Sequence, residues 1–267
     1  MYPSHWGLRE SPFRNCLDPR FFYQSPTHDE ALARLHFLVE QRRRLGVLLG
    51  VSGSGKSLLL EVFAEQLRRS GTPAARLSLQ GVTADEFLSL LAVSLQLNPS
   101  PGDSQAVLWR MVTDRLIEYR YEQLGTVVLL DDADTADERV LSQVSRLAAF
   151  DSSAQSRLTI VLTAQPDRLR RLGTRLLELA ELRIDVEPWQ QSDTADYLGT
   201  SLAQAGRQSP VFDERAVTRL HELSHGIPRR VSQLADLSLL AGAGAELSEI
   251  GVDVVESVYQ ELGLVEV

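Results

Sequence analysis

The stretch "GVSGSGKS", residues 50–57, directly follows the apolar run "LGVLL" at residues 45–49. Its spacing, G-x-x-x-x-G-K-S, is the pattern of a phosphate-binding loop. Glycines allow a tight turn in which backbone N–H groups point at an anion, and the next helix adds its positive N-terminal end. The apolar run is typical of a buried strand, and residues 58–69 have helical spacing. This context disfavours the alternative, a glycine- and serine-rich turn with a chance lysine.

The loop therefore predicts a site for ATP and Mg²⁺. We expect the Lys56 ammonium to reach the β- and γ-phosphates and the Ser57 hydroxyl to ligate Mg²⁺. The predicted cofactor-binding residues are Gly50, Val51, Ser52, Gly53, Ser54, Gly55, Lys56, Ser57 and Leu58.

Composition sets broad limits on the class of protein. The chain has 267 residues, of which 43% are hydrophobic, enough for one large domain with a smaller one. Its net charge of −9 disfavours general nucleic-acid binding but leaves room for a local basic patch. The single cysteine, Cys16, fits a reducing compartment. Because we find no signal peptide and no apolar run of membrane-spanning length, we expect a cytoplasmic protein.

Alternating strand and helix patterns predict an α/β fold. Apolar runs indicate strands at residues 46–50, 74–80, 126–132, 157–165 and 183–188. Helical patterns indicate helices at residues 26–40, 58–69, 83–95 and 104–124, the third opening with a capping box. This alternation predicts a five-stranded parallel sheet with helices on both faces, a three-layer sandwich.

Strand patterns end near residue 192. Four helices are expected at residues 193–206, 213–226, 228–242 and 252–262. We predict two domains, a phosphate-loop core with an N-terminal lead-in at 1–190 and a helical lid at 191–267. The aromatic residues Phe21, Phe22 and Tyr23 of the lead-in are expected to pack in a core, with an adenine pocket as the alternative.

A second motif, "TVVLLDDAD" at residues 126–134, supplies carboxylates. Asp131 ends a strand beside the loop, where it can hold the hydration shell of Mg²⁺, and Asp132 would orient the attacking water. A solvated loop is the alternative for Asp134 and Asp137. A calcium loop is excluded because Asp137 stands at the sixth position counted from Asp132, where glycine is needed.

These motifs together resemble a known family. The sequence is similar to the ExeA-type (general secretion pathway protein A) branch of AAA+ ATPases, akin to the transposition ATPases TniB and MuB. The resemblance rests on "HWGLRESPF" (5–13), "DPRFFYQSPTHDEALARL" (18–35), the phosphate loop, "VVLLDDAD" (127–134), "IVLTAQP" (160–166) and "GIPRRVSQLADLSLLA" (226–241). These stretches cover nearly the whole chain in the expected order.

The resemblance implies roles for further residues. Asp131 and Asp132 match the Mg²⁺-site acid and the catalytic acid, and Gln165 sits where a polar sensor contacts the γ-phosphate or water. Arg183 matches an arginine presented to the neighbouring subunit, and Arg229 matches a sensor arginine of the lid. Either arginine could instead be a solvated or ion-paired surface residue, and the arginines at 168, 170, 171 and 175 compete with Arg183.

One departure from the family pattern bears on the rate of ATP hydrolysis. The family usually has glutamate where this chain has Asp132, one methylene shorter. Because positioning errors of about 1 Å can cost around a hundredfold in rate, we expect slow hydrolysis with nucleotide binding retained.

Two functions remain open from the sequence. The first is an AAA+ ATPase that uses ATP to drive assembly or remodelling of a partner complex, and the second is a slow-hydrolysing oligomeric switch that recruits a partner or marks DNA. A small-molecule kinase is disfavoured by the "GIPRR" lid at residues 226–230. A homo-oligomer and an unidentified protein partner are expected, and the net charge gives no support to DNA binding.

Overall fold

The computed structural model describes residues 2–153 and 155–263, and the chain divides into two compact units. The sheet unit consists of His28–Gly50 and Lys56–Val186. The helical unit consists of Met1–Thr27, Val51–Gly55 and Glu187–Val267. The N-terminal lead-in therefore groups with the helical unit, whereas the sequence places it with the phosphate-loop core.

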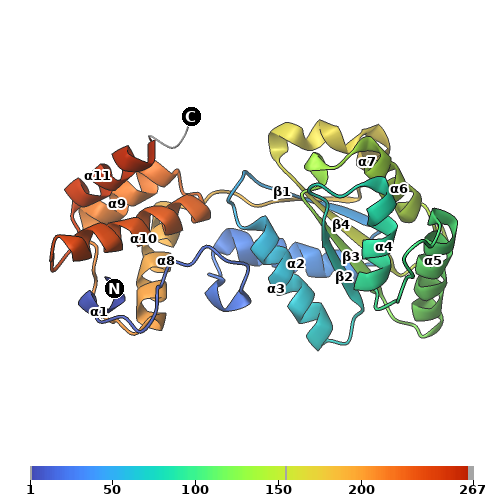
Figure 1. Ribbon diagram of the computed structural model, residues 1–267, viewed down its shortest axis with the longest axis horizontal. Helices are drawn as coiled ribbons and strands as arrows, with labels where there is room; N and C mark the ends of the chain where they lie inside the picture. Colours follow the sequence, from blue (N-terminus) through green and yellow to red (C-terminus); the bar gives the residue numbers. More distant parts are fainter. Residues whose placement is uncertain (1, 154, 264–267) are drawn as a thin grey trace. The chain divides into compact units, whose positions relative to one another are not determined.

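The five strands expected from the sequence are present and form one parallel sheet (Figure 1), which confirms the predicted fold class. The order is β2-β3-β4-β1-β5, so β4 lies between the strand that precedes the phosphate loop and the strand that ends in acid. The carboxyl ends of β1, β3 and β4 consequently meet along one edge. The strands are β1 (Leu45–Leu49), β2 (Ala74–Ser78), β3 (Thr126–Asp131), β4 (Leu158–Ala164) and β5 (Leu182–Asp185).

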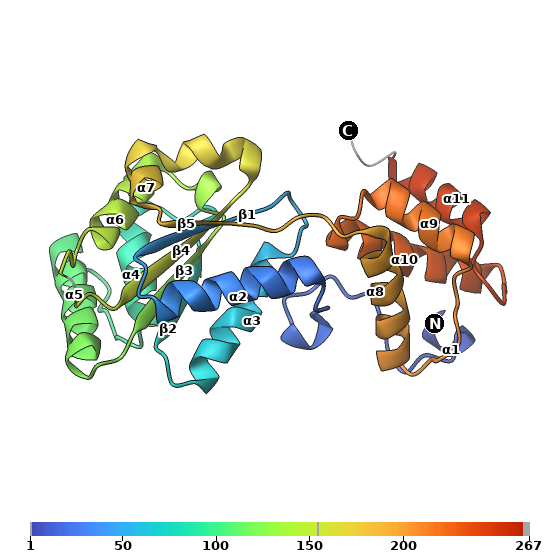
Figure 2. The same ribbon diagram turned by 180° about the vertical axis from the view of Figure 1, so that it is seen from behind.

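Both faces of the sheet are covered, which explains why the central strands are apolar at nearly every position. Helices α2 (Pro26–Glu40) and α3 (Lys56–Arg69) cover one face, and α4 (Ala84–Ser94), α5 (Gln105–Tyr121), α6 (Glu138–Ala148) and α7 (Thr174–Leu179) lie on the other (Figures 1 and 2). Gly46 of β1 leaves no room for a Cβ against Leu38 of α2.

The helical segments that flank β4 were not predicted from the sequence. Helix α6 precedes β4, and the 3₁₀ helix η3 (Pro166–Leu172) and the short α7 follow it. The capping box of α4 is present as expected, with Thr83 and Glu86 bonded reciprocally.

The helical unit packs around aromatic side chains. Its main helices are α8 (Gln191–Gln204), α9 (Glu214–Ser224), α10 (Pro228–Gly244) and α11 (Val252–Gly263). The lead-in begins with α1 (Tyr2–His5), and the buried Trp6 donates from Nε1 to the carbonyl of Leu239 at 2.8 Å. Tyr23 packs edge-on against Trp189 and Tyr197, so it belongs to this core. Burial of these rings explains why the lead-in folds onto the helices.

Two statements apply to the residues that the structure describes. After β5 they hold no further strand of the sheet, only an isolated bridge between Phe212 and Ile250. None of their helices combines the length and the apolar character needed to cross a membrane.

Candidate functional site

The phosphate loop has the backbone that its glycines permit. Gly53 and Gly55 have φ of +84° and +95°, values at which other residues are strained. Helix α3 begins at Lys56, whose side chain is buried and donates from Nζ to the carbonyl of Gly50 at 2.7 Å. The ammonium is therefore held beside the loop, at the carboxyl end of β1.

Asp131, the last residue of β3, is buried with only 2% of its surface exposed. The hydroxyl of Thr163, on the neighbouring strand β4, donates to its Oδ1 at 2.6 Å. A hydrogen bond to an ionised carboxylate is stronger than one between neutral groups, so it fixes the carboxylate's orientation. Thr163 thus positions the acid expected to serve the metal.

Arg76 of β2 joins the two residues expected to ligate Mg²⁺. Its Nη2 lies 3.4 Å from Oδ2 of Asp131 and 3.3 Å from the carbonyl oxygen of Ser57. Its Nη1 lies 3.1 Å from Oε2 of Glu61 on α3. Ser57 and Asp131 are therefore close together, as the sequence predicts for two ligands of one cation.

Asp132 has a left-handed backbone, with φ 53° and ψ 39°. Aspartate and asparagine tolerate this region better than other non-glycine residues. Its N–H donates to Thr163 Oγ1 at 2.8 Å and to Asp131 Oδ1 at 3.2 Å. Burial raises the pKa of the Asp132 carboxyl, as do the carboxylates of Asp131 and Asp134, while Lys56 and a hydrogen bond with Ser78 act to lower it.

Gln165 directly follows β4 and occupies the N-cap position of η3, so it lies at the same sheet edge. Its N–H donates to Oδ2 of Asp134 at 3.4 Å. Asp134 is 1% exposed, which overturns the solvated-loop alternative for this acid, whereas Asp137 is exposed at the start of α6. Asp134 therefore ties the turn after β3 to the turn after β4.

Arg229 lies in the helical unit, in the first turn of α10. Its N–H donates to the carbonyl of Gly53 at 3.2 Å, and a Cβ built on Gly53 would stand 3.0 Å from Ile227 Cγ2 and from Arg229 Cβ. Gly53 belongs to the part of the phosphate loop that groups with this unit. The start of α10 consequently packs on these loop residues.

Arg183 lies on β5, an edge strand. Its guanidinium is exposed and holds Asp185 of the same strand, with Nε at 2.9 Å and 3.0 Å from the two carboxylate oxygens. In register it stands beside Val47, two residues before the carboxyl end of β1. The side chain is thus an ion-paired surface residue of the sheet unit.

Comparison with known proteins identifies the family. A family model described as "AAA domain" matches residues 39–172, half of the chain, and this range holds the phosphate loop, Asp131 at the end of β3 and Asp132 after it. The chain belongs to the AAA domain family. Its sequence is also 29% identical over 245 residues to general secretion pathway protein A of Aeromonas hydrophila, which confirms the resemblance to the ExeA-type branch. The match covers 90% of this chain and 45% of that protein, so the chain spans about half of its relative's length.

Solved structures agree on the fold. The ORC1 protein of Aeropyrum pernix, solved in complex with DNA, has a TM-score of 0.71 at 17% identity and covers 96% of this chain and 69% of its own. Cdc6p of Pyrobaculum aerophilum has a TM-score of 0.71 at 20% identity, covering 92% and 70%. The RuvB Holliday junction branch migration motor of Thermotoga maritima has a TM-score of 0.60 at 14%, covering 95% and 74%. At these identities the likeness shows the fold alone.

The side chains of this AAA domain protein fit a magnesium-bound nucleotide. A buried ammonium, a hydroxyl and a buried carboxylate, those of Lys56, Ser57 and Asp131, are the groups that phosphates and Mg²⁺ require. The positive φ of Gly53 and Gly55 lets the backbone turn around a phosphate. The residues present therefore fit the cofactors that the sequence predicts.

Thr163 and Arg76 are site residues that the sequence analysis missed. Each left a weak signal: Thr163 interrupts the apolar run of β4 near its end, and Arg76 is a charged residue within a strand. Neither signal identifies its partner, because the contacts with Asp131 depend on the order of the strands.

Proposed function

We propose that this chain binds ATP with Mg²⁺ and hydrolyses it to drive assembly or remodelling of a partner complex. One observation carries the proposal: the Asp131 carboxylate is oriented by Thr163 and Arg76, and Arg76 also contacts the backbone of Ser57 in the phosphate loop. These contacts of Arg76 with Ser57 and Asp131, the expected metal ligands, support the proposal, as does the Lys56 ammonium bonded to the carbonyl of Gly50.

Each residue has a defined task in this proposal. Lys56 would hold the β- and γ-phosphates, and Ser57 and Asp131 would hold Mg²⁺, which neutralises phosphate charge when bound. Asp132 would orient the attacking water, and Gln165 would contact the same water or the γ-phosphate. Arg229, whose backbone contacts Gly53, would sense the nucleotide from the helical unit.

The nucleotide claim is tested at Lys56, the only lysine in the sequence. ATP with Mg²⁺ should protect Lys56 from an amine-acylating reagent, as measured by peptide mass spectrometry. Lys56→Ala should abolish binding of a fluorescent ATP analogue, whereas the exposed Arg69→Ala serves as a folded control. Unchanged acylation in saturating ATP, together with unchanged affinity in Lys56→Ala, would overturn the proposal.

A slow switch that recruits a partner or marks DNA is the second candidate. It is favoured by Asp132, whose carboxylate is one methylene shorter than the usual glutamate and whose left-handed backbone suits aspartate or asparagine. Single-turnover hydrolysis of wild type, Asp132→Asn and Asp132→Glu, with and without DNA, separates the two. The first candidate, an ATPase that drives assembly or remodelling, requires wild-type hydrolysis that Asp132→Asn stops and Asp132→Glu accelerates. Negligible turnover of wild type, together with tight ATP binding, supports the switch.

We further propose that ATP promotes self-assembly and that Arg183 then acts on the nucleotide of a neighbouring copy. An arginine supplied in this way stabilises charge in the transition state. Arg183→Ala mixed with Lys56→Ala should recover part of the ATPase activity, because each protein supplies what the other lacks. Each variant measured alone at the same concentration gives the baseline, and activity of the mixture no greater than the sum of the two would refute the shared site.

A further inference from the structure

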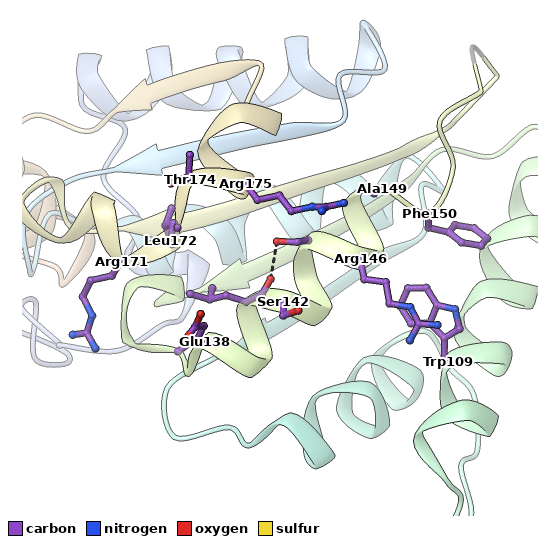
Figure 3. A pocket seen from close by; sticks show the side chains of 14 residues that line it. Trp109, Glu138, Ser142, Arg146, Ala149, Phe150, Arg171, Leu172, Thr174 and Arg175 are labelled. Atoms are coloured by element: carbon purple, nitrogen blue, oxygen red, sulfur yellow. Dashed lines mark hydrogen bonds between the residues drawn. The ribbon is translucent and has the colours of Figure 1, made fainter.

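A large hollow on the sheet unit has no part in the nucleotide chemistry described above. It has a volume of about 980 Å³ and lies among α5, α6, η3 and α7 (Figure 3). We call it the arginine hollow because Arg146 of α6, Arg171 of η3 and Arg175 of α7 all line it. Figure 3 shows Arg175 extending from α7 toward the end of α6, while Arg146 lies against Trp109.

The charges of the arginine hollow are largely unneutralised. Within the described part of the chain, the side chains of Arg171 and Arg175 form no ion pair or hydrogen bond, and Glu138 is the single acid in the lining. Arginines elsewhere, such as Arg69 and Arg183, are paired with carboxylates. Exposed guanidinium groups around a concave surface raise the local concentration of anions and bind carboxylates in bidentate fashion.

The floor of the hollow is apolar. Leu141 and Leu172 are buried beneath it, and Ala149 and Phe150 are half-buried in the lining. Surfaces that combine arginine and aromatic residues around apolar contacts are typical of the energetically dominant parts of protein interfaces. An occupant should therefore carry both acidic and apolar side chains.

A nucleic acid fits these features less well. Bases bind single-strand sites by stacking on free aromatic faces. Here the guanidinium of Arg146 covers the Trp109 ring, 3.8 Å from its centroid, and Phe150 meets the same ring edge-on at 6.2 Å.

We propose that the arginine hollow is a docking site for an acidic peptide segment of a partner protein, with an apolar side chain inserted between α6 and α7. In the sequence, the residues of the arginine hollow follow closely after the turns that hold residues of the nucleotide site. Ala136 and Glu138 of the lining follow Asp134, and η3 follows Gln165, whose N–H bonds Asp134. Docking does not depend on the proposed ATPase activity, because none of these contacts involves a nucleotide.

The test uses the full chain and a short fluorescein-labelled peptide in which Asp and Glu alternate with Leu and Phe. Fluorescence anisotropy is measured for wild type and for Arg171→Glu with Arg175→Glu. The control, Arg42→Glu with Arg215→Glu, makes the same charge change at exposed arginines outside the hollow. Circular dichroism establishes that each protein is folded.

We expect the Arg171 and Arg175 double variant to bind the peptide at least about tenfold more weakly than wild type, and the control to bind within about twofold. A peptide with Gln and Asn in place of its acids should bind weakly to all three proteins. Absence of peptide binding to wild type, or an equal loss in the two double variants, would overturn the proposal. Tighter binding of a labelled single-stranded oligonucleotide than of the peptide, lost in the hollow variant alone, would replace it with a nucleic-acid site.

Discussion

The sheet edge where the carboxyl ends of β1, β3 and β4 meet, here called the nucleotide edge, differs from the arginine hollow in how its charged side chains are paired. At the nucleotide edge, Asp131 is buried and its carboxylate is bonded by Thr163 and Arg76. In the hollow, Arg171 and Arg175 are exposed and have no carboxylate partner among the described residues. The first arrangement is satisfied within the fold, whereas the second is left for a partner. Substitutions that remove the bonds to Asp131 should therefore reduce stability, and substitutions in the hollow should reduce binding alone.

The largest stability effect is expected at Thr163. Thr163→Val keeps the shape but removes the hydroxyl that donates to Asp131 and accepts from the N–H of Asp132, so we expect a loss of about 2 kcal/mol in the free energy of unfolding. Thr159→Val, on the same strand, removes only a bond to the carbonyl of Arg43 and should cost about 1 kcal/mol. Urea unfolding measures both, and equal losses would contradict a special role for the carboxylate bond.

Arg76→Gln should have the next largest effect. It removes a cation shared by Glu61 and the buried Asp131, so we expect a loss of about 1 kcal/mol in the free energy of unfolding. It should also change the Mg²⁺ concentration needed for tight binding of an ATP analogue, because Arg76 positions a metal ligand. Arg69→Gln breaks an exposed pair with Glu65 and should alter neither quantity. An unchanged Mg²⁺ requirement would leave Arg76 with a structural role only.

Asp132→Asn should act in the opposite direction on stability. Burial, aided by Asp131 and Asp134, raises the pKa of Asp132, so the folded state holds its proton to higher pH than the unfolded chain does. Stability attributable to this group therefore falls as the pH rises through the carboxylate range. We expect Asp132→Asn to raise the melting temperature slightly at neutral pH, with a gain that disappears in acid. A melting temperature below that of wild type at neutral pH would contradict this linkage.

The smallest effect is expected in the arginine hollow. Arg171→Glu with Arg175→Glu should change the free energy of unfolding by less than about 0.5 kcal/mol, because neither side chain contributes a bond to the described fold. Urea unfolding of this variant is compared with that of the control variant, Arg42→Glu with Arg215→Glu. A large loss would show that the hollow, like the nucleotide edge, holds the fold together.

Elements whose chemistry is local could be predicted from the amino-acid sequence. Three features depend only on neighbours in the chain and were therefore predicted. They are the glycines and Lys56 of the phosphate loop, the acids at the end of β3, and the alternation of strands and helices. The capping box at Thr83 is a further case. These features predicted the fold class, and the family match confirmed it.

Contacts between residues that are distant in sequence could not be predicted, because they depend on how the elements pair in the fold. Strand order brings Thr163 and Arg76, each more than thirty residues from Asp131 in sequence, to one carboxylate. The lead-in carries no local signal for its partner, so its place in the helical unit follows only from the burial of Trp6 against α10. Likewise, the sequence offers Arg171 and Arg175 only as competitors of Arg183, and the hollow that they line with α6 and Trp109 is seen only in the fold. Local propensity fixes elements, whereas the pairing of elements depends on the burial and hydrogen bonding that only the assembled chain provides.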